Sequence, residues 1–332
     1  MEATGCELLA TDRVTAELIK HASNAFLATK ISFINSVAAI CERSGADVAL
    51  VARGMGLDPR IGPQFLEAGA GYGGSCFPKD VAAFAHRSAE LGVDFGILRE
   101  TARVNLAARQ RILDKVRDAL WHLAGKRVGV LGLAFKPETD DLREAPAMDV
   151  VRGLLAEGAE VIAYDPVAGD QALAQLPEMK LAPEPLDAVE GAHALVVMTG
   201  WPELATLDPV TARERMAYPI LVDARNALDA DAFSRAGFTV IGVGRPVRTA
   251  LTPAGRCAWP SARAARPPTP SPGRRRGRGG SCPPRHGPAA PGGRRPAGRR
   301  RRRRRWPAGR WPGSRGWRRG GRRAPGPGLA GV

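Results

Sequence analysis

The chain has 332 residues and a formal net charge of +16, but the excess of positive over negative charge lies entirely in its last quarter. Residues 254–332 hold 23 Arg and no Lys, Asp or Glu, which leaves 26 Lys and Arg against 33 Asp and Glu before them, a net charge of −7. Five scattered Cys argue against a disulfide framework and against a metal-ligand spacing, and no apolar run reaches the ~18 residues of a membrane span. Because the N-terminus also has no basic leader with a long apolar stretch, we expect a cytoplasmic protein with no membrane segment and no metal.

Residues 1–122 are predicted to form an all-helical domain. Asp12 is a suitable cap for a long helix over 14–43 that ends at Gly45, because its apolar residues recur at helical spacing. Apolar and small residues surround much of this helix, so we expect it to be buried or to form an interface between two copies of the chain. The other helices predicted here cover 47–56, 80–91 with Asp80 as its N-cap, and 97–121, which is amphipathic and connects two domains.

The segment 71–80, GYGGSCFPKD, carries the clearest chemical signature. Its three glycines within four positions permit positive φ angles and a close approach of the backbone to a ligand. Cys76 precedes a predicted helix N-terminus, where the helix dipole favours the thiolate. Nucleophilic thiols are usually presented in this way, although a Gly-rich turn with an inert, buried Cys has the same appearance in a sequence.

From 126 to 245 short apolar strands alternate with helices, which predicts a parallel α/β sheet. Strands are expected over 127–132, 160–164, 194–198, 220–222 and 238–241, with helices over 146–157 and 185–190. Ligands of such sheets bind beyond the carboxyl ends of the strands, where Phe135, Lys136 and Arg225 fall. The pair Gly129 and Gly132 is not a complete dinucleotide-binding fingerprint and predicts little on its own.

Residues 246–332 have the composition of a disordered chain. They hold 14 Pro after Gly255, an unbroken Arg run over 299–305 and almost no aliphatic residues, so they cannot bury enough apolar surface to offset chain entropy. Arg for phosphates and Trp for base stacking would suit a nucleic-acid-binding arm. We favour another interpretation, a frameshift product, because GC-rich DNA that is read out of frame encodes the same Arg, Pro, Gly and Ala.

Three segments resemble, in the same order, the family of nucleotide-sugar dehydrogenases, which oxidise an alcohol twice to an acid. These segments are LIKHASNAF at 18–26, GYGGSCFPKD at 71–80 and GLAFKPETDDLRE at 132–144. The resemblance extends over about 11–245, roughly three quarters of the chain. It implies a helical dimerisation domain followed by a Rossmann-like UDP-binding domain, a homodimer, and NAD as the cofactor.

The resemblance also implies roles for individual residues. Cys76 would bind the aldehyde formed by a first oxidation, while Lys20 and Asn24, four residues apart on one helix face, stabilise the oxyanion and Asp80 orients water or moves a proton. Lys136 and Arg225 would offset the pyrophosphate charge of the substrate. Arg60 would contact the substrate of the neighbouring subunit. The other implied substrate contacts are Phe65, Leu66, Tyr72, Gly73, Phe135, Lys136 and Arg225. Lys79 and Arg143 would contact NAD.

Within the family, Ser75 and Phe77 favour UDP-glucose as the substrate. GDP-mannose enzymes tend to have Leu at position 77, and enzymes that act on UDP-N-acetylmannosamine tend to have His at position 75. The family also has an N-terminal NAD-binding domain before the segment that matches Thr11, and only ten residues precede Thr11 here. We therefore expect a partial UDP-glucose dehydrogenase that is inactive on its own, with a non-catalytic UDP-sugar-binding or dimerisation fragment as the alternative.

Overall fold

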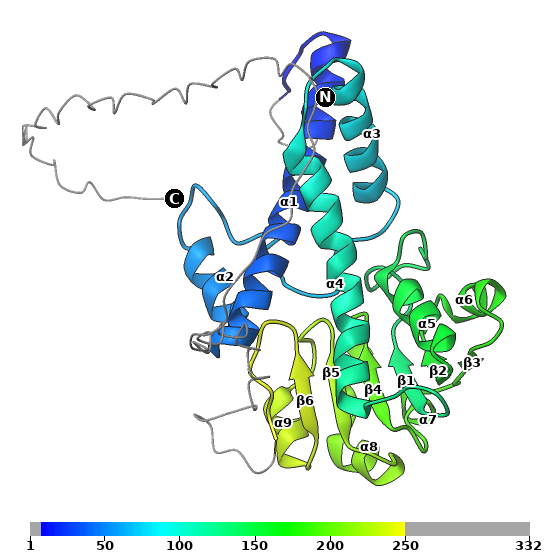
Figure 1. Ribbon diagram of the computed structural model, residues 1–332. Coiled ribbons are helices and arrows are strands. Elements are labelled where there is room, and N and C mark those ends of the chain that lie inside the picture. The colour runs from blue at the N-terminus through cyan, green and yellow to red at the C-terminus, as the bar shows by residue number, and fades with distance from the viewer. Residues whose placement is uncertain (1–7, 250–332) are drawn as a thin grey trace, which may run out of the picture. The chain divides into compact units, whose positions relative to one another are not determined.

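The computed structural model describes residues 8–249, all of which belong to one unit of the chain (Figure 1). A second unit begins at Arg266, beyond the described residues. The predictions of disorder and of a frameshift in the basic tail therefore fall, past Thr249, outside the described residues.

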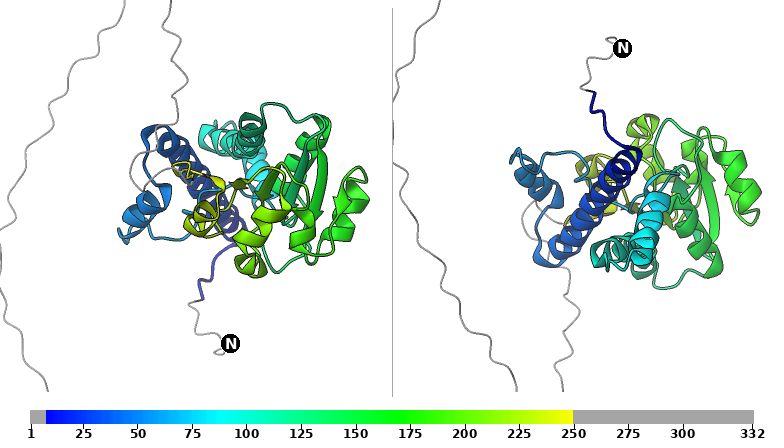
Figure 2. Two further views of the ribbon diagram at one scale, coloured as in Figure 1. Left: turned by 90° about the horizontal axis from the view of Figure 1, so that it is seen from below. Right: turned by 90° about the horizontal axis from the view of Figure 1, so that it is seen from above.

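The first half consists of helices, as predicted. They are α1 (Arg13–Ser44), α2 (Val48–Gly56), α3 (Phe77–Glu90) and α4 (Gly96–Leu120). Asp12 caps α1 through a hydrogen bond from the Thr15 amide, and Gly45 ends the helix with a φ of 79° that favours glycine. Helix α1 packs against both α3 and α4 (Figure 1, Figure 2), so α1, α3 and α4 share one apolar interior.

Helix α1 also has the length and composition of a membrane span. Length and composition alone are weak evidence for a membrane-spanning helix, because the core helix of a soluble protein has the same properties. Of its most apolar window, 39% is buried within the described residues, in contact with α3 and α4.

The prediction that Asp80 caps α3 is wrong. The helix begins three residues earlier, at Phe77, with Cys76 in the N-cap position and Pro78 in the first turn. Proline suits this place because the first amides of a helix have no partner within it. Asp80 therefore lies inside the first turn, where its side chain is buried rather than turned back onto the helix end.

The second half contains a six-stranded parallel sheet with the order β3-β2-β1-β4-β5-β6. Its strands are β1 (Arg127–Leu131), β2 (Glu160–Tyr164), β3 (Lys180–Leu181), β4 (Ala194–Val197), β5 (Ile220–Asp223) and β6 (Thr239–Gly242). Its helices are α5 (Pro146–Ala156), α6 (Gly169–Gln175), α7 (Pro185–Ala188), η1 (Pro202–Thr206), α8 (Pro209–Arg215) and α9 (Ala230–Arg235). The strand order reverses between β1 and β4, and at such a reversal open α/β sheets form a ligand-binding crevice.

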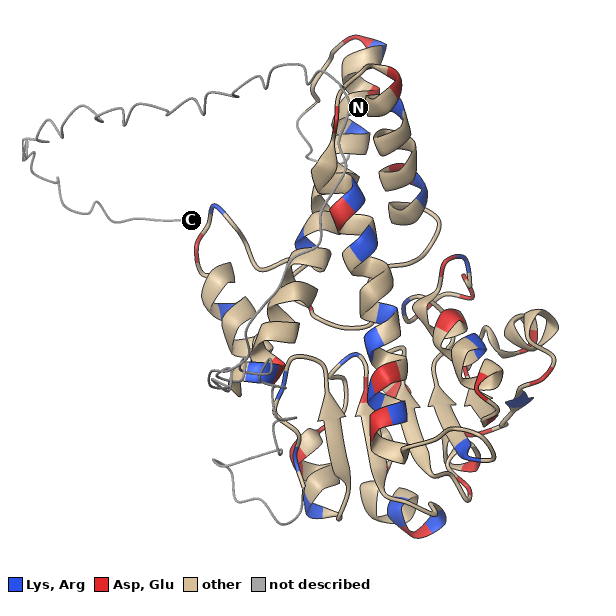
Figure 3. Ribbon diagram, in the orientation of Figure 1, with Lys and Arg blue, Asp and Glu red and all other residues tan. Residues whose placement is uncertain are grey.

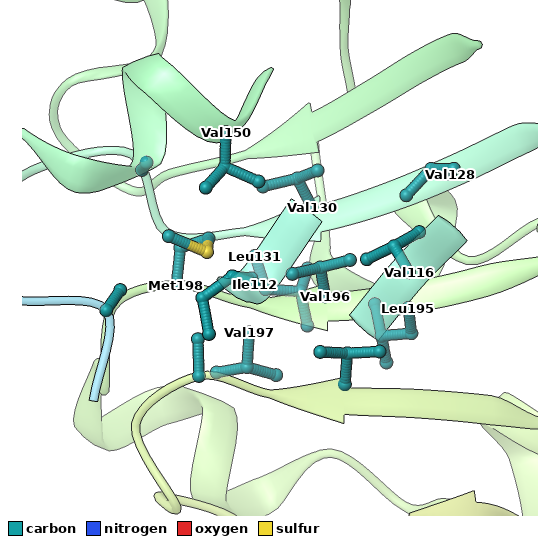
Figure 4. Packing of buried hydrophobic residues seen from close by; sticks show 14 of the residues in the cluster. Ile112, Val116, Val128, Val130, Leu131, Val150, Leu195, Val196, Val197 and Met198 are labelled. Carbon is teal, nitrogen blue, oxygen red and sulfur yellow. The ribbon is translucent and has the colours of Figure 1, made fainter. Parts of the chain in front are cut away.

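The predicted fold class, helical domain followed by a Rossmann-like sheet, is confirmed, and α4 joins the two parts. Its first half lies among the helices, while Ile112 and Val116 in its second half pack on Leu195 and Val196 of β4 (Figure 4). These side chains are all almost fully buried. Burying such apolar surface stabilises a protein by about 25 cal/mol per Å², so the contact between α4 and the sheet is a substantial one.

Candidate active site around Cys76

Cys76 is a free, exposed thiol at the N-terminus of α3. The hydroxyl of Ser75 lies 3.7 Å from its sulfur. Arg143 is also within electrostatic reach, since Asp141 chiefly, and Cys76 to a lesser extent, raise the pKa of its guanidinium. The thiol is thus accessible, precedes a helix N-terminus and has a cation nearby, which are the surroundings of a reactive cysteine.

A buried carboxylate joins Lys20 and Asn24. The Oδ2 atom of Asp80 accepts hydrogen bonds from Lys20 Nζ at 2.7 Å and from Asn24 Nδ2 at 2.6 Å. Burial raises the pKa of Asp80, but these two donors and the charges of Lys20 and Lys79 outweigh it and hold the pKa below its ordinary value. The shared helix face that the sequence predicted for Lys20 and Asn24 is present, and both residues meet an ionised Asp80.

His21 belongs to the same cluster and was not predicted. Its Nδ1 atom lies 3.8 Å from Asp80 Oδ1, and within the described part of the chain both buried atoms are without a hydrogen-bond partner. Lys79 Nζ lies 3.6 Å from the same carboxylate oxygen. A buried polar atom without a partner is costly, so this side of Asp80 is suited to a water molecule or a substrate group. His21 follows Lys20 directly in sequence, which is the only signal that marks it.

The glycines of the loop before Cys76 are packed against protein. A Cβ atom on Gly71 would lie 2.4 Å from the side-chain oxygen of Asn105. One on Gly73 would lie 2.3 Å from the carbonyl oxygen of Glu144, and one on Gly74 would lie 2.8 Å from the ring of Phe135. Positive φ angles occur at Gly71 and Gly74, as expected. The sequence predicted that a ligand would lie close to these glycines. In the structure Asn105, Glu144 and Phe135 of the same chain lie close to them instead.

Phe135, Lys136 and Arg225 lie beyond the carboxyl ends of β1 and β5, as predicted. Arg225 donates hydrogen bonds to the carbonyls of Met198 at 2.8 Å, Phe135 at 3.3 Å and Gly71 at 3.4 Å. Burial lowers the pKa of Arg225 to about 10, so it remains a cation at neutral pH. Lys136 Nζ lies 5.4 Å from the centre of the Phe135 ring.

Aromatic side chains gather beside the Cys76 loop. The ring centres of Phe65 and Tyr72 lie 5.9 Å and 6.0 Å from that of Phe77. Burial raises the pKa of Tyr72 to about 12, so its hydroxyl stays protonated. Leu66 is buried in the main apolar core. Arg60, in contrast, is exposed in the loop after α2, where it pairs with Asp58 at 2.6 Å, so one chain does not bring it to the other candidates.

Two segments of the chain match models of a known protein family. Residues 14–107 match the central domain of the UDP-glucose/GDP-mannose dehydrogenase family, and residues 129–230 match the UDP binding domain of the same family. The chain belongs to the UDP-glucose/GDP-mannose dehydrogenase family. The two matched segments correspond to the helical part and the sheet, with the C-terminal end of α4 between them.

Similar members of this family include UDP-glucose 6-dehydrogenases. TuaD of Bacillus subtilis is 43% identical over 240 residues, which are 72% of this chain and 52% of that protein. The Rhizobium meliloti enzyme is 44% identical over 72% of this chain and 55% of its own length. The structure of a UDP-glucose dehydrogenase from Pyrobaculum islandicum, 37% identical, has a TM-score of 0.67 over 74% of this chain and 54% of that chain. The chain spans about half the length of the curated relatives it matches.

NAD, the cofactor that the family resemblance implies, finds only part of a site among residues 8–249. Lys79 and Arg143 are exposed cations beside Cys76, as a contact to an anionic cofactor requires. In the adjoining cavity of about 520 Å³ acidic residues outnumber basic ones, since its lining includes Asp140, Asp141, Glu144 and Asp149 besides Arg143 and Arg152. These residues can contact a dinucleotide at one edge but do not enclose its pyrophosphate.

Proposed function

We propose that this chain carries the thiol and the uridine-nucleotide halves of a UDP-glucose 6-dehydrogenase. The observation that supports this most is the position of Cys76 at a helix N-terminus beside the Lys20, Asn24 and Asp80 cluster. The names of the similar proteins point in the same direction. The reaction is the oxidation of C6 of UDP-glucose through an aldehyde to the carboxylate of UDP-glucuronate.

In this proposal Cys76 is the nucleophile. Its thiolate attacks C6 of the aldehyde and forms a thiohemiacetal, whose oxidation gives a thioester. Lys79 and Arg143 would contact NAD⁺, which would supply the hydride acceptor for both oxidations. Water then adds to the thioester carbonyl, and collapse releases UDP-glucuronate and the free Cys76 thiol.

The cluster around Asp80 serves the oxygen on C6. Lys20 and Asn24 both donate to Asp80 Oδ2, so they are held in place to donate to an oxyanion as it develops. Removing one such donor typically lowers the rate by ~10²–10³. The Oδ1 atom of Asp80 faces His21 and accepts no hydrogen bond within residues 8–249, so it is the position from which the hydrolytic water would be held.

The nucleotide half lies at the edge of the sheet. Lys136 and Arg225 supply positive charge for the pyrophosphate, and the Phe135 ring offers a packing surface for the nucleotide. We propose that Phe65, Leu66, Tyr72 and Gly73, which lie in or near the loop before Cys76, contact the substrate. Lys79 and Arg143 contact the cofactor.

Binding of UDP to the full chain tests the nucleotide half. We expect UDP, and not GDP, to raise the melting temperature and to give a calorimetric binding signal, and Lys136→Ala to weaken that binding. Lys180→Ala is the matched control, because Lys180 is an exposed lysine of the same sheet that pairs with Glu160. An equal response to GDP, or no response to UDP, would overturn this part of the proposal.

Turnover tests the thiol half. Because Lys79 and Arg143, the NAD contacts that we propose, are exposed side chains that cannot orient a nicotinamide, we expect the 332-residue chain to produce no NADH from UDP-glucose and NAD⁺. Alignment of reactants is worth ~7–11 kcal/mol, and most of it is lost without an enclosing site. With an NAD-binding domain supplied, Cys76→Ser should abolish UDP-glucuronate formation and keep UDP binding. Steady NADH production by the chain alone, or full turnover by the Ser variant, would contradict the assignment.

We also propose a homodimer through α1. Its exposed side includes Phe26, Phe33 and Ile40, which recur at seven-residue intervals and therefore lie along one face of the helix. Arg60 would then reach the substrate of the second subunit, in keeping with its exposed side chain, which pairs with Asp58 rather than with another candidate residue.

A further inference from the structure

Two buried side chains of α4 hold the loop that leads to Cys76. Asn105 accepts a hydrogen bond from the Tyr72 amide at 2.8 Å and donates one to the Tyr72 carbonyl at 3.1 Å. Arg109, one helical turn later, donates to the same carbonyl at 3.0 Å. Both backbone polar groups of Tyr72, four residues before Cys76, are therefore bonded to α4, which fixes the course of the Gly-rich loop.

Arg109 also holds the loop between β1 and α5. Its guanidinium donates to the Glu144 carbonyl at 3.2 Å and forms an ion pair with Asp149 in the first turn of α5. Its side chain is only 6% exposed. In the described part of the chain its Nε atom is buried without a hydrogen-bond partner. A buried cation with an unsatisfied N–H group costs stability, which favours a functional reason for an arginine at this position.

The two loops also touch directly. The Gly74 amide donates to the Arg143 carbonyl at 2.9 Å, and Gly73 leaves no room for a Cβ atom against Glu144. Phe135 at the start of the second loop contacts Gly74. Arg109 thus joins the loop before Cys76, residues 71–76, to the loop between β1 and α5, residues 132–145, and the two loops also contact each other directly. Figure 3 shows that basic residues recur along α4, and Arg109 is the one that is turned into this junction.

We propose that Asn105 and Arg109 are positioning residues that set the Cys76 thiol relative to the nucleotide edge of the sheet. The planar guanidinium makes three contacts in fixed directions, to Tyr72, Glu144 and Asp149, which a lysine ammonium does not reproduce. A ligand that orders the loop starting at Phe135 therefore alters the surroundings of Cys76 through Arg109. This second step rests on the proposed function, since it requires UDP to bind at Phe135 and Lys136.

The test measures the alkylation rate of Cys76 by iodoacetamide in the full chain, by mass spectrometry of the peptide that contains it. The rate is followed from pH 6 to pH 10, with and without saturating UDP, in the wild type, Arg109→Met and Arg109→Lys. Arg103→Met is the matched control, because Arg103 lies on the same helix but forms an exposed ion pair with Glu100. UDP affinity is measured separately by calorimetry.

In the wild type and the Arg103 control we expect UDP to change the alkylation rate by about 5-fold or more. In Arg109→Met UDP still binds, but the rate ceases to respond to it, and the pH midpoint of alkylation moves. Arg109→Lys fails to restore the response. A purely structural role would lower the melting temperature and leave both the pH midpoint and the UDP response as in the wild type, and that result would overturn the proposal.

Asp149→Asn keeps the proposal testable if Arg109→Met does not fold, because Asp149 is partly exposed and the amide keeps a hydrogen-bond acceptor. It should show the same loss of response to a smaller extent, and an unchanged response would count against the proposal. Failure of the proposed function looks different. If UDP does not bind the wild type, the nucleotide assignment fails, while the pH midpoint measured without UDP still decides whether Arg109 positions the thiol.

Discussion

At the scale of single residues, the glycines before Cys76 are required by packing. Gly73 faces the Glu144 carbonyl, a backbone atom that cannot move aside as a side chain can. We expect Gly73→Ala to lower the free energy of unfolding by about 1–3 kcal/mol, the usual cost of forcing extra atoms into a packed site. Chemical denaturation measures this change.

Gly54 provides the matched control. It lies in α2, and a Cβ atom there would meet nothing within 4 Å. Gly54→Ala should raise the free energy of unfolding by about 0.5–1 kcal/mol, because alanine loses less backbone entropy in a helix. If both variants change stability in the same direction, the contact at Gly73 is not the cause.

The candidate site residues could be predicted from sequence only where they belong to a recognisable segment. Cys76, Lys20 and Asn24 lie in such segments, and the structure brings Lys20 and Asn24 together at Asp80. Arg109 gave no sequence signal, because its partners Tyr72 and Glu144 meet it only after α4 has packed against both loops. An arginine of an amphipathic helix is most often solvated, and no local pattern identifies the buried exception.

At the scale of secondary-structure elements, His193 joins the starts of β1 and β4. Its Nδ1 accepts a hydrogen bond from the Arg127 amide at 3.1 Å, which only a neutral ring can do. Burial, and then the charge of Lys126, lower the pKa of His193 below its ordinary value of 6.5. The stability that depends on neutral His193 is therefore present above pH 6.5 and is lost as the pH falls below it.

The measurement is the free energy of unfolding at several pH values between 7.5 and 5. We expect the wild type to lose more stability over this range than His193→Asn, whose side-chain oxygen can accept the same hydrogen bond at every pH. Parallel curves for the two proteins would show that His193 does not contribute to the pH dependence.

The apolar face of α1 should control assembly. Phe26, Phe33 and Ile40 are each more than half exposed, and a second copy of α1 is the partner we propose for them. Phe33→Glu should shift the chain from dimer to monomer in sedimentation at micromolar concentration. Leu106→Glu on α4 is the control, since Leu106 is equally exposed but lies on another helix. A monomeric wild type would contradict the proposal.

Most elements were predictable, including the four-residue strands β4, β5 and β6, and those that were missed are all short. Helices α1 and α4 and strands β1, β2 and β4 lie within one or two residues of their predicted bounds. Helices α6, α8 and α9 have six or seven residues, fewer than the two turns over which a helical period can be recognised, and β3 has two. The start of α3 was misplaced because Asp80 resembles a cap, whereas Pro78 was the stronger signal.

At the scale of the whole molecule, the two parts of the chain have opposite net charges. Residues 254–332 contain 23 Arg and no acidic residue, whereas the residues before them have a net charge of −7. A chain that ends at Thr249 should keep the UDP-dependent rise in melting temperature and should lose salt-sensitive binding to polyanions such as heparin. Loss of the UDP response on removing residues 250–332 would assign them a role in the site.

The continuous helix α4 has a consequence for substrate choice. Its N-terminal half packs on α1 and α3, and its C-terminal half is anchored by Ile112 and Val116 in the sheet core. A hinge motion between the helical part and the sheet would have to bend α4 or expose Ile112 and Val116. The continuous helix therefore fixes the distance between the carboxyl ends of the strands and Cys76. On the proposed function, we therefore expect the chain to favour nucleotide sugars whose oxidised carbon and diphosphate are separated by this same distance, because a longer or shorter sugar would place another atom at the thiol.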